Sequence, residues 1–190
     1  LRVAGALKEW PVGVLTLDKL ETLDLSGTGI NTVPPAMLEG HERLWRGLTL
    51  NWAAFERRAF MPVYQHVKGH PGHLVDEVLM VDAYCEGALR RLKDSDPAFA
   101  PSALAYLRRH RLTSDAKLTR VHALLDEHAT LQQALEEWQG REVEVERRPV
   151  DPLNRQRAAD KLMAHWRDGL DRRFASPREV AGPSSPVASE

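Results

Sequence analysis

The chain has 190 residues, of which 43% are hydrophobic and 28% are charged, proportions that exclude a disordered or fibrous protein. Its 26 Lys and Arg against 27 Asp and Glu give a formal net charge of -1, so no strong field would gather nucleic acid or an anionic membrane surface. The single cysteine, Cys85, excludes an internal disulfide, and no apolar run approaches the ~18 residues of a membrane span.

Residues 20–38 carry a repeating pattern of leucines. The stretch LETLDLSGTGINTVP, residues 20–34, fits the leucine-rich repeat pattern L-x-x-L-x-L-x-x-N-x-L-x-x-L-P, with Thr28 at the usual asparagine position and Leu38 closing the unit. A second copy lies 23 positions earlier, where positions 30, 33, 34 and 38 are matched by Leu7, Trp10, Pro11 and Leu15. The pattern predicts short parallel strands at 1–3 and 23–25, and a third, degenerate strand at 48–51 that closes the stack.

Strand geometry divides the side chains of this repeat between two faces. Leu23 and Leu25 point inward, and because successive side chains of a strand alternate, their neighbours point outward. Four polar residues then line one open surface, and they are the candidate protein-binding residues: Arg2, Asp24, Ser26 and Thr49. One coil cannot bury its own apolar face, so we expect at least one more repeat before Leu1 and a longer parent protein.

Beyond residue 51 the apolar residues recur at three- and four-residue steps, which predicts amphipathic helices. We expect five of them, at 52–68 with a kink or break at Pro62, then at 74–94, 102–110, 113–138 and 153–174. The last two should pair as an antiparallel hairpin, and the alternating residues 141–148 between them suit a short strand or an extended linker. All five tryptophans fall on predicted apolar faces: Trp10, Trp45, Trp52, Trp138 and Trp166.

The predicted fold class is mainly α, with a short leucine-rich repeat solenoid of parallel strands capped by a helical bundle or hairpin region. Its expected parts are repeats with a capping strand at 1–51, a helical region at 52–112 and a long helical hairpin at 113–174. Residues 175–190 are rich in Ser and Pro and are expected to form a disordered linker.

Three histidines, His66, His70 and His73, form an H-x-x-x-H-x-x-H pattern of the kind that holds a metal ion. Glycine and proline at 69, 71 and 72 break the helix before the third histidine, and no acid completes a metalloprotease-type motif. We therefore favour a solvated turn between two helices, and we expect no metal and no other cofactor.

Cys85 is the candidate nucleophile of an enzymatic interpretation. Its acidic neighbours Asp82 and Glu86 would raise a thiol pKa and oppose thiolate formation, and cysteine is among the residues most often buried. The sequence contains no Gly-rich phosphate loop and no G-x-S-x-G motif. We therefore interpret Cys85 as a buried structural residue and assign no catalytic residue.

The repeat resembles those of bacterial effector and toxin proteins, which are short and carry the apolar-Pro signature seen at Val33-Pro34 and Trp10-Pro11. Residues 44–52 and the helices after them resemble the region that follows the repeats in large toxins, some of which end in a novel E3 ubiquitin-ligase domain. The nucleophile of that family lies in a Cys-x-Asp motif, whereas this chain has Cys85-Glu86-Gly87, so the catalytic role does not carry over.

The resemblance implies that this chain recognises a target or acts as a scaffold within a longer effector that a bacterium secretes or delivers into host cells. We expect a protein partner, such as a host protein, and neither nucleic acid nor a membrane span. Two alternatives stay open: a ubiquitin-ligase-type enzyme using Cys85 as its thioester nucleophile, and a purely structural spacer. Any ligase domain of the parent is expected beyond Glu190.

Overall fold

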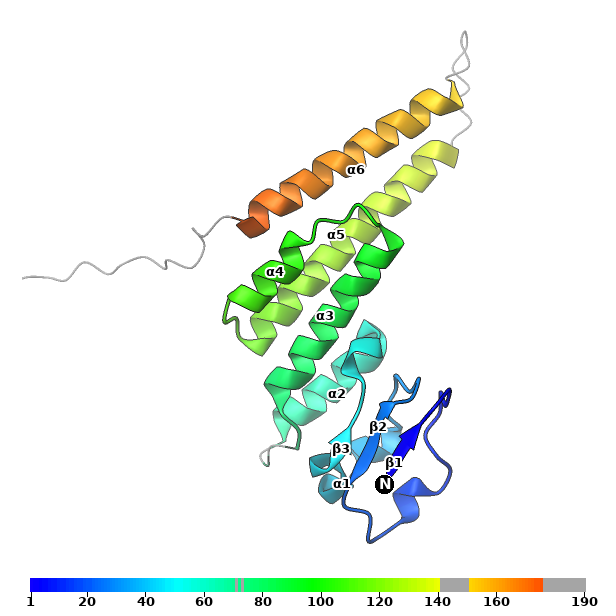
Figure 1. Cartoon of the computed structure of the whole chain (residues 1–190), viewed down its shortest axis with the longest axis vertical. Coiled ribbons are helices and arrows are strands. Elements are labelled where there is room, and N and C mark those ends of the chain that lie inside the picture. Colours follow the sequence, from blue (N-terminus) through cyan, green and yellow to red (C-terminus); the bar gives the residue numbers. More distant parts are fainter. Residues whose placement is uncertain (71, 73, 141–150, 176–190) are drawn as a thin grey trace, which may run out of the picture. The chain divides into compact units, whose positions relative to one another are not determined.

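The computed structural model describes residues 1–70, 72, 74–140 and 151–175, and within them the protein is mainly helical with one small parallel sheet (Figure 1). The alternating stretch 141–148 lies outside the described residues. The linker expected from residue 175 does too, apart from Ala175, which ends the last helix.

The sheet has three parallel strands in the order β1 (Arg2–Ala4), β2 (Leu23–Gly27) and β3 (Leu48–Thr49). All three lie where the repeat pattern predicts them, within the first fifty residues. Short helices form the connections: η1 (Val14–Thr16), η2 (Pro35–Leu38) and α1 (Glu42–Arg46). After β1 and after β2 the chain thus returns to the start of the next strand, as parallel pairing requires.

Five longer helices follow, as predicted: α2 (Arg57–Gly69), α3 (Glu77–Ser95), α4 (Ser102–Arg109), α5 (Ser114–Gly140) and α6 (Pro152–Ala175). The first begins later than expected, because the 3-10 turn η3 (Trp52–Ala54) and an extended Phe55 precede it. α2 continues through Pro62 without a break.

The described chain divides into two compact units, and α5 contributes to both. The first, unit 1, comprises Leu1–Leu92 and Leu112–Leu124; the second, unit 2, comprises Lys93–Arg111 and the described residues from Leu125 onward. The boundary between the two units falls inside α5, between residues 124 and 125. The units therefore differ from the consecutive ranges expected from the sequence.

The core of unit 1 lies behind the sheet. Leu23 and Leu25 are fully buried, as the alternation of strand side chains predicts, and the loop after β2 and the helix η2 add buried Ile30 and Met37. Farther along the chain the rings of Phe60 and Tyr84 stack with their centroids 3.9 Å apart, and these aromatic residues are also fully buried. The sheet and the first two long helices therefore contribute to the same unit.

In unit 2 the second half of α5 and α6 run antiparallel. Gln139 of α5 donates to Gln156 at 3.3 Å, while Glu127, twelve residues earlier on α5, accepts a hydrogen bond from Trp166, ten residues later on α6, at 2.9 Å. Contacts that move back along α5 therefore move forward along α6, which only antiparallel helices allow. The buried residues between them are Leu135, Ala159 and Met163.

Some apolar residues that the sequence places on buried faces are exposed. Trp138 is 39% exposed and Leu162 is 48% exposed, so their assignment to the core is wrong; Val78 and Leu79, in the first turn of α3, are also exposed. The physical reason is that an apolar stripe on a helix can be wider than the area one neighbouring helix covers.

Candidate protein-binding surface

The four candidate residues for protein binding lie on one face of the sheet. Arg2 is in register with Asp24, and Asp24 is in register with Thr49, so these three side chains form a row across β1, β2 and β3. Ser26 lies two residues after Asp24 and therefore on the same face. We call Arg2, Asp24, Ser26 and Thr49 the polar row; Asp24 is half-buried and the others are exposed.

The opposite face of the same strands is apolar. Leu23 is in register with Leu48, and both are buried, as is Leu25. Because side chains alternate along a strand, burying these leucines forces the polar row outward. The alternation of strand side chains therefore predicts correctly which face of these strands points outward.

Asp24 is the electrostatic centre of the polar row. Its Oδ1 accepts hydrogen bonds from the Ser26 hydroxyl at 2.6 Å and the Ser26 backbone N–H at 3.0 Å, and its Oδ2 lies 3.4 Å from Arg2 Nε. The Ser26 hydrogen bonds, and secondarily the charge of Arg2, lower the pKa of Asp24 below its ordinary value. The carboxylate is therefore ionised at neutral pH and oriented toward the side of Ser26.

Hydrogen bonds behind the sheet hold the turns that support the row. Thr28 donates from its hydroxyl to the Leu25 carbonyl at 2.7 Å and accepts from the Ile30 N–H at 3.3 Å. Trp10 donates from its indole N–H to the Thr32 carbonyl at 2.7 Å, which connects the segment after β1 to the segment after β2. The buried turn polar groups thus have partners, as burial requires.

Comparisons with protein-family models, with curated proteins and with solved structures find no match for this chain.

Cys85 lies on α3 with 1% of its surface exposed. Burial raises the pKa of its thiol to about 12, and the nearby Asp82 adds to this, while Lys117 opposes it. A thiolate is thus scarce at neutral pH and is not accessible to a macromolecular substrate. This environment is that of a structural cysteine.

Two of the three histidines in the pattern lie near each other, since the His66 and His70 ring centroids are 6.0 Å apart. The His66 ring lies 5.6 Å from that of Trp45, and His70 Nε2 lies 3.0 Å from a carboxylate oxygen of Glu42. His73 lies outside the described residues. In the described part of the chain no three His, Cys, Asp or Glu side chains are placed to hold a metal ion.

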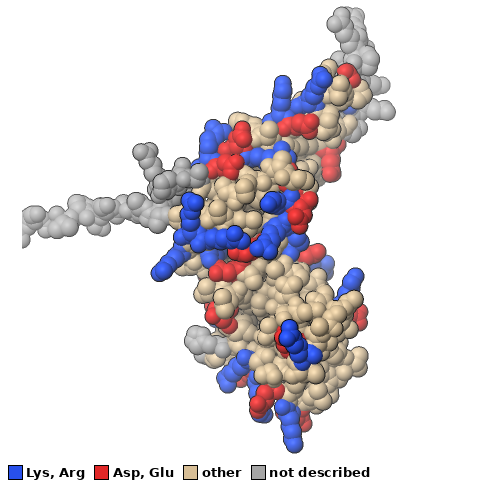
Figure 2. All heavy atoms as spheres, in the orientation of Figure 1, with Lys and Arg blue, Asp and Glu red and all other residues tan. Residues whose placement is uncertain are grey.

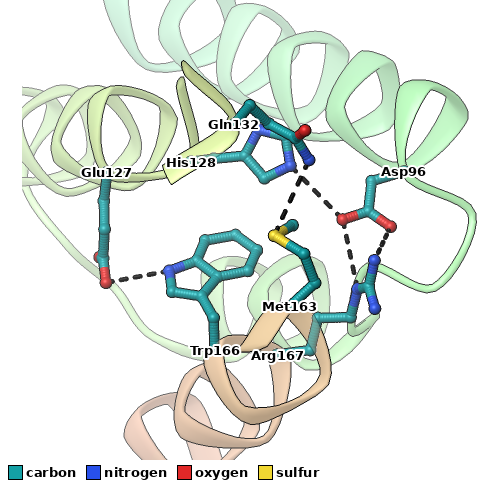
Figure 3. Close-up of polar contacts among 7 residues, drawn as sticks. All are labelled: Asp96, Glu127, His128, Gln132, Met163, Trp166 and Arg167. Carbon is teal, nitrogen blue, oxygen red and sulfur yellow. Dashed lines mark hydrogen bonds and ion pairs between the residues drawn. The ribbon is translucent and has the colours of Figure 1, made fainter. Parts of the chain in front are cut away.

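Unit 2 contains a polar cluster that the sequence analysis missed (Figure 3). Asp96 is 6% exposed, and its carboxylate accepts hydrogen bonds from Arg167 at 2.6 and 3.2 Å. His128 Nε2 lies 3.4 Å from the same carboxylate, and the His128 and Trp166 rings lie 5.1 Å apart. These residues are far apart in sequence, so no local pattern could have revealed them.

This cluster joins three segments of the chain. Asp96 follows α3, His128 belongs to α5, and Arg167 belongs to α6, and Figure 3 shows them pointing toward one another. A bidentate Arg–carboxylate pair has a fixed geometry, so it sets how these segments meet. We assign the cluster a structural role.

A hollow of unit 1 lies between the loop after β2 and the start of α2. It has a volume of about 500 Å³, with Asn31, Thr32, Glu56 and Arg58 among its polar lining and Val63 among its apolar lining. It therefore combines charged groups with an apolar patch, and it is the second surface of this unit suited to a protein segment.

Neither sign of charge dominates the face of the molecule that Figure 2 shows. On that face, basic and acidic side chains are intermixed, in keeping with the formal net charge of -1. None of the helices that the structure describes is long and apolar enough to cross a bilayer.

Proposed function

We propose that this chain is a protein-binding module in which a short leucine-rich repeat stack presents the polar row to a partner protein. In this proposal the chain recognises a target, or acts as a scaffold, within a longer bacterial effector or toxin. The observation that carries the proposal is the register of Arg2, Asp24 and Thr49 across three parallel strands.

The position of the polar row favours recognition over a structural role. Its side chains lie opposite the buried leucines, and their polar contacts in the structure are among themselves: Arg2 with Asp24, and Asp24 with Ser26. Surface groups of this kind contribute little to folding, whereas a preformed row of charge and hydroxyl groups suits electrostatic complementarity with a partner.

The repeat interpretation rests on the recurrence of one structural unit. Two coils each place a short strand in one sheet and return through a compact turn, and the Trp10 and Thr28 hydrogen bonds support those turns. The helices after β3 would then cover the end of the stack, because a terminal repeat needs a cap.

Charge reversal at Asp24 tests this proposal. Asp24→Arg should leave the melting temperature nearly unchanged, because the group is partly exposed, yet it reverses the charge at the centre of the polar row. The immobilised wild type and the variant are each incubated with a host-cell lysate, and the captured proteins are identified and compared. A melting curve of each protein checks that both are folded. Proteins enriched by the wild type should be lost from Asp24→Arg.

The matched control is Asp168→Arg, the same charge change at an exposed position of α6. It should retain every captured protein, which would exclude a general effect of net charge. A photo-crosslinking amino acid at the exposed Thr49 should label a captured protein, whereas the same group at the exposed Thr119 should not. If Asp24→Arg and the wild type capture the same proteins equally, the polar row is not the recognition surface.

The hollow beside α2 is the alternative recognition surface in that event. Arg58 lines it and is exposed, so Arg58→Glu would then be the change that releases captured proteins. The ubiquitin-ligase alternative needs an accessible Cys85 thiolate, and the burial of that side chain argues against it.

A further inference from the structure

One side of the hairpin formed by α5 and α6 carries an apolar hollow. Its volume is about 340 Å³, and its lining residues are all apolar and come from these two helices alone: Ala134, Leu135, Trp138, Ala158, Ala159 and Leu162. Trp138 is 39% exposed and Leu162 is 48% exposed. Large apolar side chains that gather in one place on a surface mark an interaction site more often than scattered ones do.

Few side chains are buried between α5 and α6 beside this hollow. Leu135, Ala159 and Met163 are the buried cluster of the hairpin, with Leu131 and Trp166 only partly buried against it. A pair of helices buries only the side chains that face each other, whereas a four-helix bundle buries a second side of each helix as well. Leu135 and Ala159 of that cluster form the floor of the hollow, and its other lining residues lie on a second, exposed side of the two helices. This part of the hairpin therefore resembles half of a four-helix bundle.

The exposed stripe has the same spacing on both helices. Ala134 and Trp138 are four residues apart on α5, and Ala158 and Leu162 are four residues apart on α6, so each pair lies one helical turn apart on one face. Small alanines beside one large residue on each helix leave room for a large residue of another helix pair.

The charges of the two helices select the kind of partner. From Leu125 to Gly140, α5 carries no Lys or Arg and four acids: Asp126, Glu136, Glu137 and Glu127, the last of which is paired with Arg173 of α6. From Pro152 to Met163, α6 carries Arg155, Arg157 and Lys161 against a single acid, Asp160. The hairpin therefore offers one acidic and one basic helix side by side, which makes it complementary to itself.

We propose that a second copy of this chain covers this face. In the two-fold arrangement α5 of each copy packs on α6 of the other, with the Trp138 ring of one copy over the Leu162 side of its partner's hollow. A two-fold interface uses the same patch on both subunits, so the patch must be self-complementary, and this hairpin is. Packing α5 on its own copy would instead place acid against acid. The proposal does not depend on the polar row.

Two charged residues flank the hollow in equivalent places. Glu137 lies three residues after Ala134 on α5, and Lys161 lies three residues after Ala158 on α6, and both are exposed. In the proposed arrangement Glu137 of each copy faces Lys161 of the other copy, so the dimer contains two such pairs. Opposite charges at the rim of an interface set partner choice.

The first experiment measures the mass of the full chain in solution by sedimentation equilibrium. The wild type should form a dimer with a dissociation constant below about 100 μM. Leu162→Glu should abolish this dimer, because it places two charges in the apolar interface. The matched control Leu17→Glu makes the same change at a residue of unit 1 that is 53% exposed, and it should leave the dimer intact. Circular dichroism must show that both variants are folded.

The second experiment exchanges charges. Glu137→Lys and Lys161→Glu should each weaken the homodimer about tenfold, whereas an equal mixture of the two variants should form a heterodimer close to wild-type strength. Glu136→Lys is the control, since residue 136 is two positions from both Ala134 and Trp138 and thus on the other side of α5. A wild type that stays monomeric overturns the proposal. So does a dimer that is insensitive to Leu162→Glu or fails to recover in the mixture.

Discussion

At the scale of single residues, two glycines inside helices have opposite surroundings. A Cβ added to Gly87 of α3 would lie 2.1 Å from the Ala53 carbonyl oxygen, whereas one added to Gly169 of α6 would meet nothing within 4 Å. Both residues have ordinary helical positions, so the difference is one of packing alone. Gly87 allows α3 to approach the backbone of η3 closely.

This difference predicts opposite effects of the same substitution. Gly87→Ala should destabilise the protein by about 1–3 kcal/mol, because the backbone of η3 must move away. Gly169→Ala should stabilise it by up to about 1 kcal/mol, because alanine loses less backbone entropy in a helix. Urea unfolding of both variants measures this, and changes of the same sign would contradict the packing argument.

The Cys85 thiol makes stability depend on pH in the alkaline range. Its folded pKa of about 12 lies above the ordinary value of 9.0, so the folded state keeps the proton that the unfolded state releases. The stabilisation is fully present below pH 9.0 and is lost as the pH rises from 9.0 to about 12. Tyr84, whose pKa burial raises to about 12, acts with the same sign from pH 10.0 upward.

Cys85→Ala should therefore flatten the decline in unfolding free energy above pH 9.0 without altering its slope near neutrality. The measurement is urea unfolding of wild type and variant at a series of pH values from neutral to alkaline. In the same samples, the native wild-type thiol should react with a disulfide reagent only as fast as the protein unfolds. An equal alkaline slope in both proteins, or rapid native modification, would show that Cys85 is exposed.

At the scale of elements, Asp96 connects the end of α3 with α5 and α6. The Arg167 guanidinium supplies two hydrogen bonds to its carboxylate, and the cluster is largely removed from water. Breaking one partner of a buried ion pair leaves the other uncompensated, which costs far more than removing an exposed pair.

A double-mutant cycle measures this connection. Asp96→Asn and Arg167→Gln should each destabilise unit 2 by about 2–3 kcal/mol, and the double variant should cost clearly less than the two together. Asp94→Asn, at an exposed residue two positions earlier in α3, is the control and should be near neutral. Additive effects of Asp96→Asn and Arg167→Gln would mean that the two residues act independently.

At the scale of the whole molecule, the balance of charge governs which macromolecules the chain attracts. Its net charge of -1 and the intermixed charges of the visible face predict no saturable binding of a short DNA duplex at about 0.15 M salt. Fluorescence anisotropy of a labelled duplex, with a basic DNA-binding protein as the positive control, measures this. Binding that weakens steeply with added salt would reveal a basic surface on another face.

The sequence was sufficient for the elements and for the outward direction of the polar row. Leu23 and Leu25 alternate with Asp24 and Ser26, and a period of two residues fixes both the strand and its buried face. The later helices follow from a period of three to four residues in the same way. These are local properties, because each depends on the side chains of one segment and on backbone geometry.

Only the tertiary structure decided which apolar stripes are covered and which distant groups meet. The period of α5 and α6 shows that Trp138 and Leu162 lie on an apolar side, but their exposure depends on how much of that side a neighbour covers. Asp96 meets a guanidinium 71 positions away, and Cys85 acquires its raised pKa from the atoms packed around it. Burial and long-range pairing are properties of the assembled fold, since they depend on segments whose spacing in the sequence carries no record of their contact.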